Sequence, residues 1–398
     1  MKRIFLFAIW VMGTLFLQAQ VNPETQNIAD NQLTSGNKLT IGGYGEVHYH
    51  QPFSSDIRQN GELDVHRVVM LFGYQFSERT QFVTELEFEH VSEIAVEQAF
   101  LQHRISKSIN FKAGLLLIPM GIVNEYHEPT TFNGVDRPLV DQKISPTTWR
   151  EVGFGFSGII QPASLKYQVY LVNGFNGYDG TAKLNGQNGL RSGRQDGAES
   201  YISSPNFTGK VEYYGIRGLN IGLSGYFGDT QSRLYNGIVK DNQAALARAD
   251  SSVVGISMFG LDARYSIKGL QLRGQLYRVG LSNTEQYNRF TRTDGGALND
   301  LGSVMTGYYV EAGYNVFRSY ENLKTELVPF LRIEGYDTQA EVADNSIKVK
   351  AYKNSVITIG LTLKLAQGAV LKTDLQFVKP EGSGSYTKVF SAGFGVMF

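Results

Sequence analysis

Six histidines and the carboxylates beside them are the residues in this sequence with the clearest potential for chemistry. His48 and His50 form an H-x-H pair that a strand would place on one face, together with Glu46. Two imidazoles so placed are compatible with a metal ion, but a third ligand has to come from elsewhere in the chain. The pair alone does not predict a metal site, and we expect no bound metal.

A hydrolytic enzyme would need a histidine held beside a carboxylate and a nucleophile or activated water. His90 follows Glu89 and His127 precedes Glu128, but neighbours on a strand point to opposite faces. The glycine-rich stretch 173–189 lacks the strand, glycine and helix order of a phosphate-binding cradle, and we interpret it as a mobile surface loop. We therefore expect no catalytic residues, no cofactor and no enzymatic activity.

A long segment with many ionisable residues interrupts the apolar patterns in the run GLLLIPMGIVNEYHEPTTFNGVDRP, Gly114 to Pro138. The apolar stretch stops at Pro119, and the next aromatic run begins only near Trp149, about thirty residues later. Structureless insertions of that length in a compact domain are uncommon and are usually functional or disordered. Its candidate site residues are Glu125, His127, Glu128, Asp136, Arg137, Asp141 and Lys143.

Strict period-two alternation surrounds this segment and predicts β-strands of about ten residues. In TQFVTELEFEH, for example, Leu86 and Phe88 lie on one face, and Glu85, Glu87 and Glu89 lie on the other. The pattern predicts sixteen strands, near residues 39–50, 64–76, 80–90, 95–105, 109–118, 149–160, 164–173, 205–214, 219–228, 253–267, 270–281, 304–317, 323–336, 351–365, 369–379 and 387–398.

The links between these strands alternate between tight turns, as at 77–79 and 268–269, and mostly long loops, as at 119–148 and 229–252. An even number of antiparallel strands with short turns at one end and long loops at the other is typical of a bacterial outer-membrane barrel. A soluble two-sheet sandwich would also alternate, so alternation alone does not decide.

The N-terminus and the aromatic residues favour the membrane barrel. Lys2 and Arg3 precede an apolar stretch and a small residue, Ala19, in the order of a cleaved secretory signal. Aromatic residues lie near strand ends, where interfacial girdles belong: Tyr44, Tyr49, Tyr74, Tyr167, Tyr265, Tyr308, Tyr314 and Phe398. We predict a signal peptide at 1–19, an N-terminal periplasmic segment at 20–38 and an all-β transmembrane barrel at 39–398.

The polar residues, which alternate with apolar ones along each strand, then face an aqueous lumen. Charged side chains that face lipid would cost roughly 2–4 kcal/mol near the midplane. The predicted pore-lining residues are Glu85, Glu87, Glu89, Arg67, Lys112, Lys166, Lys210, Arg264, Arg273, Lys324 and Arg332. These charges form either a transverse field, with an acidic wall facing a basic one, or salt-bridged walls with no part in permeation. The 37 basic and 37 acidic residues of the chain balance, so nothing indicates a nucleic-acid partner.

Residues 114–138, together with TTWREVGFGFSG that follows at 147–158, resemble the phosphate-selective porin O and P family. The specific similarity covers about fifty residues. The resemblance implies a homotrimer of sixteen-stranded outer-membrane barrels in which the third long loop, Met120 to Thr148, constricts the pore. Phosphate channels of that family carry arginine ladders, which do not map onto this balanced wall residue by residue.

Two classes of function follow. The first is a passive diffusion channel for small hydrophilic solutes or inorganic ions, including a specific phosphate or anion channel, with the 119–148 loop as its filter. An ordinary surface loop is the alternative for that segment. The second class is a plugged barrel in the outer-membrane lipid that acts as a surface adhesin or structural protein.

Overall fold

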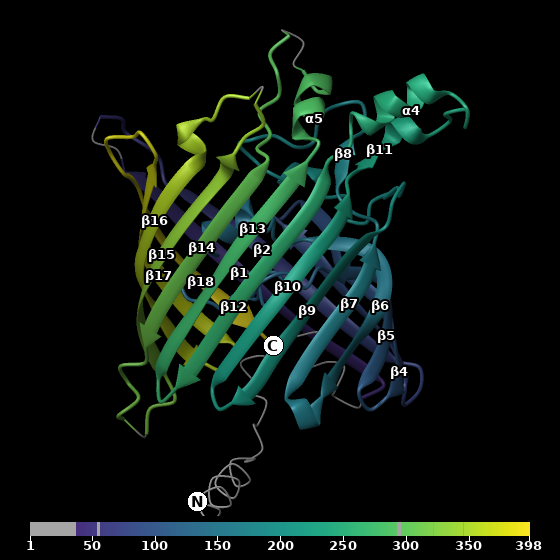
Figure 1. Ribbon diagram of the computed structural model, residues 1–398. Coiled ribbons are helices and arrows are strands. Elements are labelled where there is room, and N and C mark those ends of the chain that lie inside the picture. The colour runs from purple at the N-terminus through teal and green to yellow at the C-terminus, as the bar shows by residue number, and fades with distance from the viewer. Residues whose placement is uncertain (1–36, 54–55, 293–295, 321, 345) are drawn as a thin grey trace, which may run out of the picture.

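Sixteen antiparallel strands form one closed barrel in the computed structural model, which describes residues 37–53, 56–292, 296–320, 322–344 and 346–398 (Figure 1). The predicted barrel fold is confirmed. The barrel closes where β1 (Leu39–Phe53) pairs with β18 (Thr387–Met397). There Gly43 and Phe398 exchange two backbone hydrogen bonds of 3.0 and 2.9 Å. Closure pairs every strand edge, which hydrocarbon surroundings require because they offer no hydrogen-bond partner.

The other barrel strands follow one another around the wall in chain order. They are β2 (Glu62–Gln75), β3 (Thr80–Glu89), β4 (Glu93–Ser106), β5 (Ile109–Leu117), β6 (Arg150–Ile160), β7 (Leu165–Val172), β9 (Asn206–Ile216), β10 (Leu219–Asp229), β12 (Gly255–Ile267), β13 (Leu270–Ser282), β14 (Val304–Tyr314), β15 (Glu326–Glu341), β16 (Lys353–Ala366) and β17 (Ala369–Pro380). Each coincides with a predicted strand, and β15 continues to Glu341, beyond its predicted end at 336. The predicted signal peptide, and the segment 20–38 up to residue 36, lie outside the described residues.

The two ends of the barrel differ as the spacing predicts. Short turns join the strands at the lower end in Figure 1, and long loops cover the upper end. The loops carry the helices α4 (Gln243–Asp250) and α5 (Thr284–Phe290) and a small parallel pair, β8 (Asn176–Tyr178) with β11 (Gln231–Ser232). In the part of the chain that the structure describes, no helix is long and apolar enough to cross a membrane.

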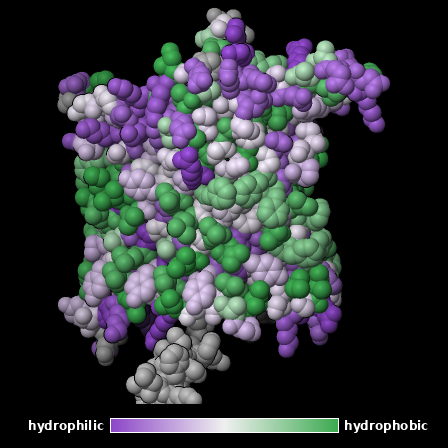
Figure 2. All heavy atoms as spheres, in the orientation of Figure 1, coloured by the Kyte–Doolittle hydropathy of each residue, from purple (hydrophilic) through white to green (hydrophobic). Residues whose placement is uncertain are grey.

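The wall has an apolar outer face and a polar inner face. On β7, Val169 and Leu171 are exposed on the outside, whereas the alternate residues Gln168 and Tyr170 are buried inside. Figure 2 shows the consequence, because hydrophobic side chains cover much of the middle and lower parts of the barrel and hydrophilic ones gather at the loop end. This arrangement is typical of a barrel whose outer band faces lipid.

The prediction that Tyr44 belongs to the interfacial aromatic residues on the outside of the barrel is wrong. Tyr44 is only 1% exposed and lies inside the barrel, where its hydroxyl donates a hydrogen bond of 2.7 Å to Glu97. Its position near a strand end predicts its height along the barrel, but not whether the side chain points to lipid or to the lumen. That depends on the alternation of side chains along β1.

Candidate functional site

The segment between β5 and β6 folds into the interior of the barrel. Its apolar residues Met120, Ile122, Val123 and Val135 are almost fully buried. Polar side chains from widely separated strands of the wall bond to its backbone, for example Arg67 on β2 and Arg332 on β15. An ordinary surface loop would leave most of these groups in water, so we call residues 119–148 the lumen loop.

The two ends of the lumen loop are fastened to each other. The Ile118 amide donates to the carbonyl of Trp149 at 3.0 Å. Asn124 then bridges the pair: its Nδ2 donates to both the Ile118 and Trp149 carbonyls, at 2.7 and 2.9 Å, and its Oδ1 accepts from the Trp149 amide at 2.7 Å. One buried amide side chain thus holds the neck of the lumen loop against the wall.

Glu125 lies in a buried cluster of alternating charges. Its carboxylate accepts a hydrogen bond from Gln168 and pairs with Lys210 at 2.9 Å. Lys210 also donates to the Gly121 carbonyl at 2.6 Å and lies 3.4 Å from Asp262. Burial alone would raise the pKa of Glu125, but Lys210 and the nearby Lys166 hold it below its ordinary value.

The ring of the next residue, Tyr126, packs between two predicted pore-lining cations. The Arg264 guanidinium lies 4.2 Å from the ring centroid, and the Lys166 ammonium lies 5.7 Å from it. Arg264 is held in place by Glu212 at 2.8 Å. These cation–π contacts add to the attachment of the lumen loop to β7 and β12.

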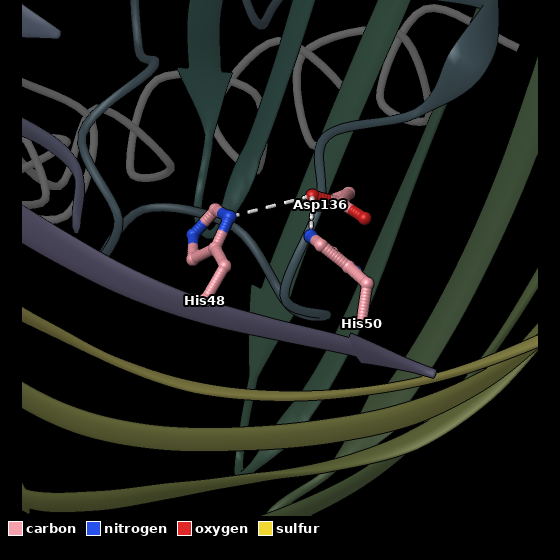
Figure 3. A group of neighbouring side chains, drawn as sticks. All are labelled: His48, His50 and Asp136. Atoms are coloured by element: carbon pink, nitrogen blue, oxygen red, sulfur yellow. Dashed lines mark ion pairs between the residues drawn. The ribbon is translucent and has the colours of Figure 1, made fainter. Parts of the chain in front are cut away.

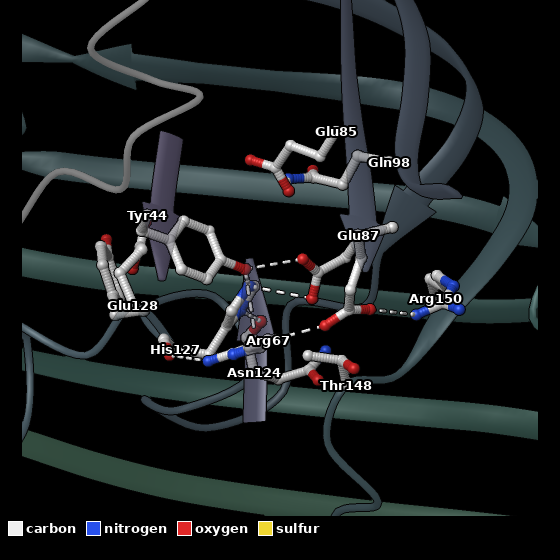
Figure 4. A network of polar contacts seen from close by, with 12 residues as sticks. Tyr44, Arg67, Glu85, Glu87, Gln98, Asn124, His127, Glu128, Thr148 and Arg150 are labelled. Carbon is white, nitrogen blue, oxygen red and sulfur yellow. Dashed lines mark hydrogen bonds and ion pairs between the residues drawn. The ribbon is translucent and has the colours of Figure 1, made fainter. Parts of the chain in front are cut away.

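His127 connects the lumen loop to β1, β2 and β4 (Figure 4). Its Nε2 lies 3.0 Å from both the Tyr44 hydroxyl and Glu97 Oε1. Its carbonyl accepts a hydrogen bond of 2.7 Å from Arg67, which also pairs with Glu87 at 3.6 Å. The partner of His127 is therefore a carboxylate on β4, and the neighbouring Glu128 in the sequence is not its partner.

Tyr44 and Glu97 are site residues that sequence reasoning missed. The pairing of β3 with β4 shifts register between Glu85 and Leu86, so that both Glu97 and its neighbour Gln98 are buried. A β-bulge of this kind places two consecutive residues opposite one, and period-two counting cannot detect it. Gln98 lies beside the bulge and opposite Glu85, and it donates a 2.9 Å hydrogen bond to the Glu85 carboxylate.

The stretch from Asn133 to Asp136 is attached to β14, β15 and β17. Arg332 donates to Glu311 at 2.8 Å and to the carbonyls of Asn133 and Asp136 at 2.5 and 3.2 Å. The Val135 amide donates to Asp374 at 2.7 Å. Gly134, with φ of +83°, allows the backbone to turn this close to the Arg332 side chain.

The last part of the lumen loop contains the short helix α3 (Leu139–Lys143). Asp141 is fully buried there, and its Oδ1 accepts hydrogen bonds from the Tyr277 hydroxyl at 3.0 Å and from Gln275. Burial raises the pKa of the Asp141 carboxyl to about 7, although both hydrogen bonds act in the opposite direction. Lys143 is partly buried, and burial together with nearby Arg191 lowers its pKa.

Substitution of Asp141 by Asn is expected to remove part of the pH dependence of stability. The pKa is raised on folding, so the contribution of Asp141 is fully present below about pH 4 and is lost as the pH rises through 7. Between pH 6 and 8.5 the unfolding free energy of the parent should therefore fall by about 1 to 1.5 kcal/mol more than that of Asp141→Asn. Urea unfolding in detergent at both pH values measures this, with the exposed Asp250→Asn as control. Identical pH dependence in parent and variant would show that Asp141 is ionised throughout.

The long loop after β7 holds the lumen loop from the upper side. Arg191 donates to the Thr147 carbonyl at 2.6 Å, and Arg194 donates to the Thr148 carbonyl at 2.9 Å. Within 173–189, Phe175 and Leu184 are fully buried. The interpretation of that stretch as a mobile surface loop is therefore wrong, because glycine content indicated flexibility while its few apolar residues pack into the interior.

Most predicted wall residues lie on the inner face of the barrel and form local pairs. Arg273 pairs with Glu311 at 3.3 Å, and Arg67 pairs with Glu46 at 2.6 Å. Glu89 is half-buried at the end of β3. Lys112 lies inside the wall against the ring of Phe100. Opposite charges therefore meet between neighbouring strands, while the transverse field stays a prediction.

Lys324 is the exception among the predicted wall residues. It precedes the first residue of β15, Glu326, and so belongs to a short turn at the lower end of the barrel. There it lines a cavity of about 510 Å³ below the lumen loop. The cavity also contains Arg264, Arg273 and Lys364, against the single acidic residue Glu326.

Comparison with solved structures identifies the same architecture at low sequence identity. The anion-selective porin from Comamonas acidovorans covers 90% of this chain and 99% of its own, with a TM-score of 0.56 and 13% identity. The outer-membrane channel DcaP of Acinetobacter baumannii covers 90% of this chain and 97% of its own, with a TM-score of 0.57 and 10% identity. Salmonella typhi OmpF covers 92% of this chain and 99% of its own, with a TM-score of 0.54 and 13% identity. At such identities these likenesses establish a porin-type fold.

Sequence comparison adds a relative that matches most of the chain. No family model matches the sequence, so the resemblance to the phosphate-selective porin O and P family stays a prediction. An uncharacterised protein of Aquifex aeolicus (strain VF5) is 31% identical over 348 residues, which span 84% of this chain and 74% of that protein. This chain belongs to the same protein family as the Aquifex aeolicus protein.

Proposed function

We propose that this protein is a passive diffusion channel of the bacterial outer membrane for small hydrophilic solutes or inorganic ions, with the lumen loop as its filter. The observation that carries the proposal is a closed sixteen-strand barrel whose charged inner wall surrounds an inserted loop. A barrel of this size is wide enough to enclose an aqueous channel. The loop then narrows the channel and brings ionisable residues to the narrowest section.

The attachments of the lumen loop support a fixed constriction. Charged or polar side chains on β2, β9, β13, β15 and β17 bond to it, so its position is defined from all sides of the wall. In the same proposal the signal at 1–19 directs export, the apolar outer band contacts outer-membrane lipid, and the protein is a homotrimer without enzymatic activity.

Anions are the solutes that the charge distribution favours. Above the lumen loop lie Arg191 and Arg194, and below it the cavity is lined by four basic side chains and one acidic one. A lining in which basic side chains outnumber acidic ones raises the local concentration of anions. This is the observation in favour of the anion or phosphate channel, and the Comamonas structural neighbour is itself named an anion-selective porin.

The plugged barrel is the second candidate, because the same burial of the lumen loop could close the lumen. A plugged barrel needs its inner charges paired, and many of them are. Such a protein would act through its long loops as an adhesin or a structural component. The two candidates differ in one direct observable, which is ionic current.

Single-channel recording in planar bilayers is the test. We expect discrete open steps and a reversal potential in a KCl gradient that indicates anion preference. Low phosphate should reduce the chloride current if phosphate binds. Arg191→Gln should shift the reversal potential towards cations, because it removes a charge at the mouth, whereas Arg278→Gln on the outer face should not. Absence of current from correctly folded protein would contradict the channel and favour the plugged barrel.

A further inference from the structure

Two histidines on the wall and one aspartate of the lumen loop meet inside the barrel (Figure 3). His48 and His50 lie on the same face of β1, as residues two apart on a strand do. Asp136 Oδ1 lies 3.6 Å from His48 Nδ1 and 3.7 Å from His50 Nε2. Both distances are too long for hydrogen bonds. The H-x-H pair thus gains, from the fold, the third ligand that its own strand lacks.

The two distances from Asp136 are close to those expected around a small ion, and all three atoms lie within 4.8 Å of one another. Zn²⁺ bonds to histidine nitrogen and carboxylate oxygen are about 2.0–2.2 Å, so ligand atoms around a tetrahedral ion lie about 3.3–3.5 Å apart. The observed 3.6 and 3.7 Å need only a few tenths of an ångström of contraction. Three protein ligands leave a fourth position for water or another ligand, as in open zinc sites.

The outer nitrogens of both rings are already engaged, which orients the inner ones. His48 Nε2 lies 3.2 Å from Glu46 Oε2, and an ionised carboxylate can only accept, so Nε2 carries the proton. Glu46 is held in turn by Arg67 at 2.6 Å. His50 Nδ1 lies 3.0 Å from the Ser391 hydroxyl on β18. Histidines that bind metals usually have such a partner on the second nitrogen.

The backbone on either side of Asp136 is fixed independently of its side chain. Val135 donates to Asp374, and the Asp136 carbonyl accepts from Arg332. The carboxylate itself is 42% exposed and makes no other ion pair among the described residues than those with His48 and His50. Its side chain is therefore presented to the two rings and is accessible to an incoming ion.

Two further histidines connect this group to the long-loop end. His66 stacks on His48 with ring centroids 4.6 Å apart, and His90 lies 5.6 Å from His66. Asp64 contacts both, at 3.5 and 2.7 Å. His90 follows the last residue of β3 and is exposed at the rim. A row of neighbouring imidazoles thus extends from the rim to the site.

We propose that His48, His50 and Asp136 form a binding site for one divalent transition-metal ion of the Zn²⁺ type, shared between the barrel wall and the lumen loop. Imidazole with carboxylate selects such ions over Mg²⁺ and Ca²⁺, which take oxygen ligands. A bound ion would tie Asp136 to β1 and would add a second link between the lumen loop and this strand, beside the contact of His127 with Tyr44.

The test is Zn²⁺ binding to detergent-folded protein without a polyhistidine tag, measured by competition with a chromogenic chelator at pH 7.5. We expect one ion per chain that millimolar Mg²⁺ does not displace. His50→Ala and Asp136→Asn should each lower the affinity at least 10-fold, and Ser391→Ala should lower it about 10-fold. The exposed His103→Ala, on β4 beside Thr80, is the matched control and should bind as the parent does. Gel mobility before and after heating shows that each variant is a folded barrel.

Two results would overturn the site. The first is a Zn²⁺ affinity that Asp136→Asn leaves unchanged. This substitution removes the proposed carboxylate ligand, and the fold should tolerate it because the side chain is partly exposed and other contacts hold the backbone. The second is binding that Asp64→Asn abolishes and Asp136→Asn does not, which would assign the ion to His66 and His90 at the rim. Failure of the channel measurements would leave these binding results unaffected.

Discussion

Replacement of the lumen loop by a two-residue Asn-Gly turn between Ile118 and Trp149 is expected to raise single-channel conductance several-fold. The loop backbone meets side chains from strands all around the wall, so its removal widens the barrel at its narrowest section. The two junction residues already share a backbone hydrogen bond of 3.0 Å, as the ends of a hairpin do, and Asn-Gly suits a two-residue turn. The exposed inner charges would then be solvated by lumen water.

The matched control shortens a loop outside the barrel interior. Helix α4 projects from the long-loop end in Figure 1, and replacing residues 236–248 by a short linker should leave the conductance unchanged. Both variants must show the heat-dependent gel mobility of a folded barrel. Equal conductance of parent and loop-deleted protein would contradict the filter. Current that appears only after the deletion would identify the parent as a plugged barrel.

The barrel itself could be predicted because its two environments alternate along every strand. Lipid outside and polar groups inside give each strand a period of two, and residues such as Val169 and Gln168 follow it strictly. The asymmetry of turns and loops then gives the orientation of the strands. These signals are local, so a single sequence contains them.

The site could be predicted only in part, because its contacts join residues that are far apart in the chain. The composition of 119–148 indicated the lumen loop, yet neither the meeting of His127 with Glu97 nor that of Asp136 with His48 follows from spacing. The first depends on a β-bulge, and the second depends on how the loop crosses the lumen. Arg191 acts through a loop whose glycines indicated only flexibility.

Substitution of Arg332 by Met is expected to lower the free energy of unfolding by about 3 kcal/mol. Arg332 is 1% exposed, donates to Glu311 and to the Asn133 and Asp136 carbonyls, and lies 3.8 Å from Glu334. Removing one partner of a buried ion pair leaves the other charge without compensation, and this costs about 3–5 kcal/mol. The lower value applies because Arg273 still lies 3.3 Å from Glu311. Urea unfolding followed by tryptophan fluorescence measures the change.

An exposed pair of an arginine and a glutamate is the control. It shows how much stability is lost when any arginine of the wall is removed. Arg278 pairs with Glu341 at 3.4 Å, and both side chains are more than half exposed, so Arg278→Met should cost less than about 1 kcal/mol. The double variant Arg332→Met with Glu311→Leu should recover part of the lost stability, because it removes a buried carboxylate that only Arg273 still compensates. It should not restore the bonds of Arg332 to the Asn133 and Asp136 carbonyls, so its single-channel current should be noisier than that of the parent. A stability loss in Arg332→Met no larger than in Arg278→Met would mean that water replaces the guanidinium and that the lumen loop is held by its other contacts.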